Sequence, residues 1–194
     1  MTPQDWRILL AAYLIGSIPT AYIVTWIIKK TDIRRLGDGN VGGKNTFISV
    51  GRLVGVVVSL IDIGKGILSI TLARHYSASE WVILLAGTCA ILGHDFPIFL
   101  KFRGGQGMAT MAGVFLMLFP LQMAVVLCTL MLTLLFTHNW NLSCAVACVL
   151  LVILNWIMEV PIKRFFYVII LLPSLWLRRY MQDKQAQREA LSHR

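Results

Sequence analysis

The sequence GHDFPIFLKFRGGQGMAT, residues 93–110, places a cationic, glycine-rich turn between two apolar segments. Gly104, Gly105 and Gly107 have no side chains that would shield their main-chain amides from a ligand. Such amides can point at one oxyanion, and the start of the following helix adds the positive end of its dipole. Lys101 and Arg103 supply neutralising charge. The turn therefore predicts a binding site for a phosphate or a carboxylate.

The composition is that of an integral membrane protein, because 57% of the residues are hydrophobic and 14% are charged. A helix needs about 20 apolar residues to cross a bilayer. Apolar runs that approach or exceed this length are Trp6–Ile28, Leu53–Leu72, Trp81–Leu100, Met108–Phe136, Ser143–Met158 and Ile162–Leu177. We expect one all-α transmembrane domain over residues 1–194, of which residues 178–194 form a basic cytoplasmic tail.

The fourth run, Met108–Phe136, is too long for one ordinary span, since a single helix of this length would measure about 44 Å. Pro120 lies near its middle, and proline interrupts a helix. We therefore expect two short spans that turn at Phe119–Pro120, which gives about seven transmembrane helices. One kinked, strongly tilted helix is the competing interpretation.

Charge placement predicts the orientation. With seven spans and the N-terminus outside, the outer segments receive only Arg7, Arg74, Lys163 and Arg164. The other cations outside the predicted spans lie on the inner side, in agreement with the positive-inside rule. Both glycine-rich turns then face the cytoplasm. The tail after Arg178 is read either as a helical extension attracted to anionic headgroups or as a solvated topology anchor.

Another glycine cluster, the first in chain order, is GDGNVGGKNT at residues 37–46, which follows the first apolar run. Its glycines have the G-x-G-x-x-G spacing of a dinucleotide-binding motif. That motif must follow a β-strand, whereas this cluster follows a predicted membrane helix, so the dinucleotide-binding interpretation fails. The Walker pattern also fails, because Asp38 and Asn45 stand where it requires Gly and Ser or Thr. The cluster predicts a flexible anion-binding loop. The alternative is a tight turn that is rich in glycine for steric reasons.

Ionisable residues inside predicted spans are costly and tend to be functional or paired. Asp62 and Lys65 are three residues apart and can form an ion pair on one helix. Lys65 can instead point its ammonium at a phosphate in a cavity. His94 can bind a phosphate oxygen, act as a general acid or base, or be only a satisfied polar group.

These motifs together resemble the bacterial acyl-phosphate:glycerol-3-phosphate acyltransferases of the PlsY type. Residues 16–20 are similar to the family's G-S-I-P-[ST], and residues 32–45 to its D-I-R…G-S-G-N-x-G-A-T-N. Residues 62–66 are similar to D-x-x-K-G, and residues 93–110 to G-H-x-F-P…F-K-G-G-K-G-V-A-T. The resemblance implies a multi-pass protein of the bacterial inner membrane. It also implies transfer of a fatty acyl group from acyl phosphate to glycerol 3-phosphate, giving lysophosphatidic acid for phospholipid synthesis.

The resemblance also implies a set of site residues. The catalytic residues would be His94, Lys65 and Asn45. The substrate-binding residues would be Asn40, Gly42, Lys44, Arg103, Gly104, Gly105, Gly107 and Ser143. We expect no metal, no cofactor and no nucleic acid. Membrane lipids are expected partners, and a protein partner stays open.

The chain departs from the family pattern at charged positions. Asp38 replaces a serine, Ile48 an arginine and Gln106 a lysine, and the family's C-terminal pattern is not recognisable after Arg178. The pocket loses about three positive charges, of which Lys44 restores one. The chain is then either an acyltransferase helped by Lys44 or an impaired paralogue that serves as a membrane subunit or lipid-binding protein. An anion transporter is disfavoured, because no internal repeat is apparent.

Overall fold

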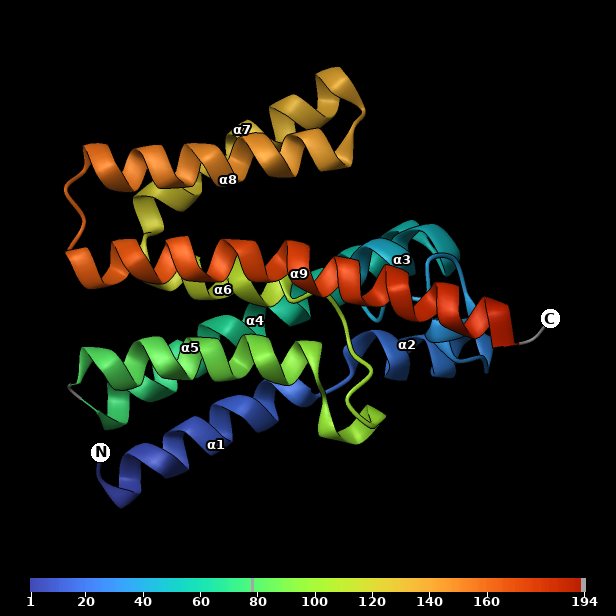
Figure 1. Ribbon diagram of the computed structural model, residues 1–194, viewed down its shortest axis with the longest axis horizontal. Coiled ribbons are helices and arrows are strands. Elements are labelled where there is room, and N and C mark those ends of the chain that lie inside the picture. Colours follow the sequence, from blue (N-terminus) through green and yellow to red (C-terminus); the bar gives the residue numbers. More distant parts are fainter. Residues whose placement is uncertain (78, 193–194) are drawn as a thin grey trace. The chain divides into compact units, whose positions relative to one another are not determined.

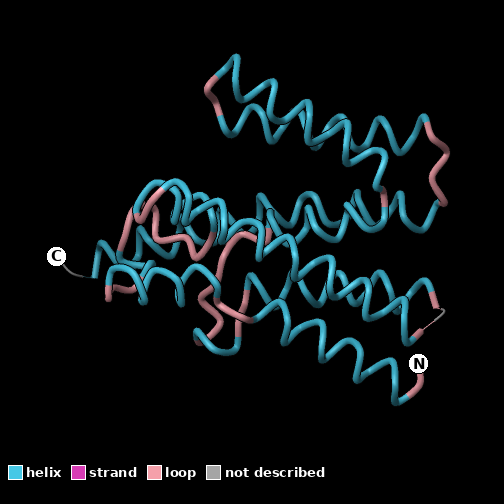
Figure 2. The backbone as a smooth tube through the Cα atoms, turned by 180° about the vertical axis from the view of Figure 1, so that it is seen from behind, coloured by secondary structure: helices cyan, strands magenta, loops and turns pink. Residues whose placement is uncertain are grey.

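The computed structural model describes residues 1–77 and 79–192, without the side chains of residues 183 and 185–192. All regular structure in these residues is helical (Figure 1, Figure 2). The α-helices are α1 (Pro3–Ser17), α2 (Thr20–Lys29), α3 (Gly43–Ser49), α4 (Arg52–Tyr76), α5 (Glu80–Asp95), α6 (Met108–Leu118), α7 (Pro120–Thr137), α8 (Trp140–Ile157) and α9 (Ile162–Ser192). Two short 3-10 helices are η1 (Ile33–Arg35) and η2 (Ile98–Leu100).

The chain forms two compact units. The first comprises Met1–Val114 and Leu175–Arg194, and the second comprises Phe115–Ser174. In the first unit, α1 packs along α5 and also contacts α4 (Figure 1). In the second, α7 packs against α8. All the motifs quoted above lie in the first unit.

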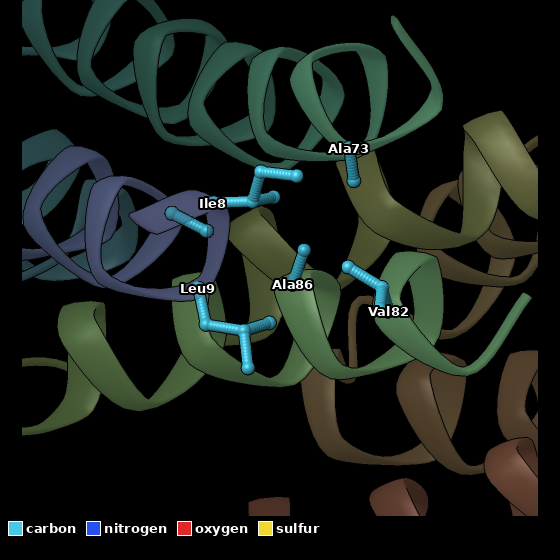
Figure 3. Close-up of a cluster of buried hydrophobic side chains, with 6 residues drawn as sticks. Ile8, Leu9, Ala73, Val82 and Ala86 are labelled. Atoms are coloured by element: carbon cyan, nitrogen blue, oxygen red, sulfur yellow. The ribbon is translucent and has the colours of Figure 1, made fainter. Parts of the chain in front are cut away.

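Close packing of α1 on α5 depends on small residues. A Cβ atom added to Gly16 would lie 2.1 Å from the carbonyl oxygen of Ala90, and one added to Gly93 would lie 2.2 Å from that of Tyr13. Glycines that let two backbones touch are typical of helix interfaces in membranes. Nearby, α1, α4 and α5 share a cluster of buried apolar side chains (Figure 3): Ile8, Leu9, Ala12, Ala73, Val82 and Ala86.

The sequence predicted one continuous helix for the first span, and this prediction is wrong. It breaks between Ser17, where α1 ends, and Thr20, where α2 begins. Pro19 has no main-chain N–H and disfavours a helical conformation at the residue before it. Ile18 accordingly has ψ of 115°, outside the helical region. The break leaves the carbonyl of Ile18 available to a side chain from another helix.

The predicted division of the long fourth run is confirmed, because α6 ends at Leu118 and α7 begins at Pro120. Within residues 1–77 and 79–192, five stretches are long and apolar enough to cross a membrane: Pro3–Lys29, Arg52–Tyr76, Glu80–Leu100, Pro120–Thr137 and Trp140–Ile157. Helix α6 has only 11 residues, about half of what a full crossing requires. The predicted seventh segment forms the first half of α9.

Many large apolar side chains are exposed on α7 and α8. They include Leu132, Leu135, Phe136, Val149, Ile153 and Trp156. A soluble monomer rarely exposes so many apolar side chains on neighbouring helices, whereas lipid tails solvate them without cost. Helix α9 runs without interruption from Ile162 past Arg178 to Ser192, so the tail is helical up to this residue.

Candidate active site

A buried ion pair forms the centre of the candidate site. On α4, the Lys65 ammonium donates to Asp62 Oδ1 at 2.6 Å, and the two side chains are 5% and 1% exposed. Lys65 also donates to the main-chain carbonyl of Ile18, at the break between α1 and α2. The predicted i,i+3 pair is thus confirmed. Because an ammonium has three hydrogens, these two contacts leave one for a ligand.

His94 lies beside this pair at the end of α5. Its Nδ1 is 3.8 Å from Asp62 Oδ1, and the ring is buried. The opposite edge of the ring faces the second glycine loop in chain order, residues 104–107, since a Cβ added to Gly105 would lie 2.1 Å from His94 Nε2. Two helices and one loop therefore fix the imidazole next to the only ammonium that is buried among the described side chains.

A small pocket joins these groups. Its lining residues are Gly16, Ser17, Ile18, Pro19, Thr20, Val41, Lys65, His94 and Pro97. The pocket has room for about one water molecule. In this conformation it admits one end of a ligand, such as a hydroxyl or a phosphoryl oxygen. The helix break, the ion pair and the histidine thus meet at one place, although they lie far apart in the sequence.

The second glycine loop differs from the expected anion cradle in the direction of its amides. The Gly104 N–H donates to the Asp95 carbonyl at 3.2 Å, and the Gly105 N–H donates to the His94 carbonyl at 3.0 Å. These two amides close the turn against the end of α5, so they do not converge on one point with the amide of Gly107. The glycines are needed because the loop backbone lies directly against His94 and Asp95.

Asn45 stabilises the first glycine loop. Its side-chain amide donates to the carbonyls of Leu36 at 2.9 Å and Asn40 at 3.0 Å, and its Oδ1 accepts from Ser49 Oγ at 3.0 Å. The side chain is buried. These contacts give Asn45 a structural role in holding residues 36–40. Asp38 contributes to the same turn by accepting from the Asn40 N–H at 3.1 Å.

An ion pair fixes the start of this loop. Arg34 Nη2 lies 2.6 Å from Asp32 Oδ2, and the Arg34 N–H donates to Asp32 Oδ1 at 2.9 Å. Partial burial raises the pKa of Asp32, but the hydrogen bonds from Arg34 outweigh burial and hold the pKa below its ordinary value. Asp32 is therefore ionised at neutral pH and keeps the loop attached to η1.

The C-terminal helix supplies two residues that the sequence interpretation missed. Arg178 donates from Nη2 to the Asp95 carbonyl at 2.6 Å and from Nε to the Gly105 carbonyl at 3.1 Å. Its guanidinium carbon lies 4.4 Å from the centre of the Phe96 ring. The side chain is only 7% exposed, so Arg178 itself is not solvated. Arg178 is a buried clamp on the second glycine loop.

Gln182, one helical turn after Arg178, connects the two glycine loops. Its Nε2 donates to the Gly104 carbonyl at 3.0 Å and lies 3.4 Å from Asn40 Oδ1, while its Oε1 accepts from Gln106 Nε2 at 2.9 Å. The i,i+4 spacing of Arg178 and Gln182 on one helix face was the available sequence signal. Gln106, which replaces the lysine of the resembling family, is thereby hydrogen-bonded to another glutamine.

The other predicted site residues lie at different places. Gly42 precedes the first turn of α3, and Lys44 is exposed on that turn. Arg103 is exposed in the second glycine loop. Ser143 belongs to the second unit, where its hydroxyl donates to the Asn139 carbonyl at 2.9 Å. The first unit thus brings Lys65 and His94 together at the pocket, with both glycine loops nearby.

We expect Gly105→Ala to lower kcat/KM about 100-fold, because the new methyl group must displace the His94 ring or the loop. Steady-state kinetics and thermal unfolding of the purified variant measure the effect. Gly64→Ala is the matched control, since a Cβ at that position meets no atom within 4 Å. Equal kinetics for the two variants would show that contact between the loop and His94 is irrelevant to turnover.

Comparison with known proteins agrees with the sequence motifs. A family model described as "Glycerol-3-phosphate acyltransferase" matches residues 6–188. Glycerol-3-phosphate acyltransferase 2 of Lactobacillus johnsonii is 49% identical over 56% of this chain, which spans about half (51%) of that relative's length. Glycerol-3-phosphate acyltransferase of Bacillus cytotoxicus is 42% identical over 77% of each chain.

A solved structure is also similar over nearly the whole chain. It is the crystal structure of PlsY (YgiH), an integral membrane glycerol 3-phosphate acyltransferase, in its glycerol 3-phosphate form. The TM-score is 0.84 at 25% identity, with 95% of this chain and 92% of that chain covered. This likeness agrees with the all-α membrane fold that the composition predicts.

Proposed function

We propose, since this chain belongs to the glycerol-3-phosphate acyltransferase family, that it transfers a fatty acyl group from acyl phosphate to glycerol 3-phosphate. The products would be lysophosphatidic acid and inorganic phosphate. The observation that carries the proposal is the pocket where Lys65 and His94 meet at the break of the first span. A buried ammonium beside an imidazole suits a reaction between two phosphate-bearing substrates.

The chemistry requires little beyond positioning and charge stabilisation, because an acyl phosphate is already activated. The 1-hydroxyl of glycerol 3-phosphate attacks the acyl carbonyl, a carbon–oxygen ester bond forms, and the carbon–oxygen bond to phosphate breaks. The hydroxyl proton passes to a base, for which His94 is the candidate at the pocket. The Lys65 ammonium stabilises the negative charge that develops on the carbonyl oxygen or on the departing phosphate.

The altered loop residues are compatible with an active enzyme. Gln106 replaces a cation, yet its side chain is satisfied by Gln182 and the loop remains closed. Lys44 is exposed on α3, where it can add positive potential at the loops without contacting the buried pair. An impaired paralogue that serves as a membrane subunit or lipid-binding protein is the weaker alternative, because Asp62, Lys65 and His94 are all retained around the pocket.

For the membrane, the proposal places the N-terminus outside, both glycine loops in the cytoplasm and the helix after Arg178 on the cytoplasmic side. The distribution of cations supports this orientation, and the bacterial relatives support the bacterial plasma (inner) membrane as the location. Labelling of single cysteines in spheroplasts by a membrane-impermeant maleimide tests the orientation. A cysteine at position 2 would react, whereas one at position 39 would not.

The activity test uses the purified full chain in detergent and no other protein. With acyl phosphate and glycerol 3-phosphate, we expect equal amounts of inorganic phosphate and lysophosphatidic acid. Glycerol in place of glycerol 3-phosphate is the control for acceptor recognition, and we expect no lipid product from it. Phosphate release without lysophosphatidic acid would indicate a hydrolase, and no release above background would favour the subunit alternative.

A further inference from the structure

Two buried hydroxyl groups at the break of the first span lack a partner. Ser17 is 0% exposed and Thr20 is 7% exposed. Within the part of the chain that the structure describes, neither Ser17 Oγ nor Thr20 Oγ1 makes a hydrogen bond. Burial of a polar group without a partner costs free energy. Both residues line the pocket that contains Lys65 and His94, so a ligand in this pocket would satisfy them.

A cation and a helix N-terminus lie beside the two hydroxyls. The Lys65 ammonium reaches the same break, where it donates to the Ile18 carbonyl. Thr20 is the first residue of α2, a helix of 10 residues. Its own N–H donates to the Ile18 carbonyl at 3.0 Å, whereas the next amides of a first turn lack intrahelical partners. The positive end of the helix dipole adds to the charge of Lys65. Hydrogen-bond donors that surround the Lys65 ammonium favour a ligand with an anionic oxygen over one with a neutral carbonyl.

We propose that Ser17 and Thr20 are substrate-binding residues that donate hydrogen bonds to an oxygen of a phosphoryl group held by Lys65. The proposal rests on the proposed acyltransferase function and assigns a phosphate subsite to the break between α1 and α2. The sequence interpretation assigned phosphate binding to the two glycine loops. In the structure, however, the amides of Gly104 and Gly105 are used within the turn, whereas the hydroxyls at the helix break have no use within the fold.

The phosphoryl group has two sources, glycerol 3-phosphate and acyl phosphate, and kinetics can separate them. We expect Ser17→Ala and Thr20→Val each to raise one KM about 10-fold and the double variant to raise it about 100-fold, while the other KM changes little. A raised KM for glycerol 3-phosphate assigns the subsite to the acceptor. A raised KM for acyl phosphate, together with weaker product inhibition by inorganic phosphate, assigns it to the donor.

Stability distinguishes this role from a structural one. Removal of an unsatisfied buried hydroxyl leaves the thermal midpoint of the free protein unchanged or higher. The stabilisation of the wild-type protein by saturating glycerol 3-phosphate or inorganic phosphate should be smaller in the variants. Thr25→Val is the matched control, because Thr25 is a buried, unpartnered hydroxyl on α2 that does not line the pocket. We expect its kinetics to equal those of the wild type.

The outcomes separate the two proposals. An inactive wild-type protein would contradict the acyltransferase function itself. An active wild-type protein whose Ser17→Ala and Thr20→Val variants keep both KM values and the full stabilisation by phosphate would overturn the subsite alone. Equal losses in the Thr25→Val control and the pocket variants would overturn it as well, since the effect would then follow from the helix and not from the pocket.

Discussion

Replacement of Lys65 by methionine is expected to lower turnover about 1000-fold. The substitution removes the ammonium that stabilises developing negative charge in a site with little water. It also leaves the Asp62 carboxylate buried without its partner at 2.6 Å, which costs about 3 to 5 kcal/mol of stability. Phosphate release under saturating substrates measures the first effect, and denaturant unfolding in detergent measures the second.

A second variant separates catalysis from folding. In Asp62→Asn combined with Lys65→Met, the unpaired charge is absent, so we expect much of the lost stability to return while turnover stays low. Lys30→Met is the control for a change in net charge, because Lys30 is exposed at the end of α2, away from the pocket. Recovery of turnover in the double variant would mean that Lys65 acts only by neutralising Asp62.

Replacement of Arg178 by methionine is expected to lower kcat/KM about 100-fold. The guanidinium holds the Asp95 and Gly105 carbonyls in place, and a displacement of the loop by about 1 Å can cost this much activity. Hydrogen bonds from charged groups contribute about 2 kcal/mol each, so stability should fall as well. Steady-state kinetics and thermal unfolding of the purified variant provide the two measurements.

Two further variants define the role of Arg178. Arg178→Lys keeps the charge but not the planar guanidinium that reaches both carbonyls, so we expect only partial activity. Arg179→Met is the matched control, because this neighbouring side chain is exposed, and we expect near wild-type kinetics. If Arg178→Met were fully active, the second glycine loop would not need the C-terminal helix to hold its shape.

Two of the prolines inside apolar runs, Pro120 and Pro19, show what the sequence can and cannot predict. Pro120 lies in a run too long for one span, so length and residue type together predicted the division between α6 and α7. Pro19 lies in a run of ordinary length, and nothing in the length required a break there. The break matters more for function, because it places the Ile18 carbonyl against Lys65.

The candidate site was predicted unevenly for a physical reason. The pair of Asp62 and Lys65 depends on spacing within one helix, which the sequence states directly. The roles of Arg178 and Gln182 depend on contacts with residues more than 70 positions earlier. In the sequence they follow an apolar segment and resemble a polar tail. Their i,i+4 spacing places them on one helix face but does not identify the residues that this face contacts.

The sequence by itself determined the helical membrane architecture, the division at Pro120, the buried ion pair and the motifs of the family. These follow from the amino-acid composition, the lengths of the apolar runs and the spacing of residues along the chain, which are local properties of the sequence. Tertiary structure alone decided that the amides of Gly104 and Gly105 close the turn, that Arg178 clamps it, and that two unpartnered hydroxyls line the pocket. Such features depend on which distant backbones approach one another, and that choice is set by the packing of the whole unit.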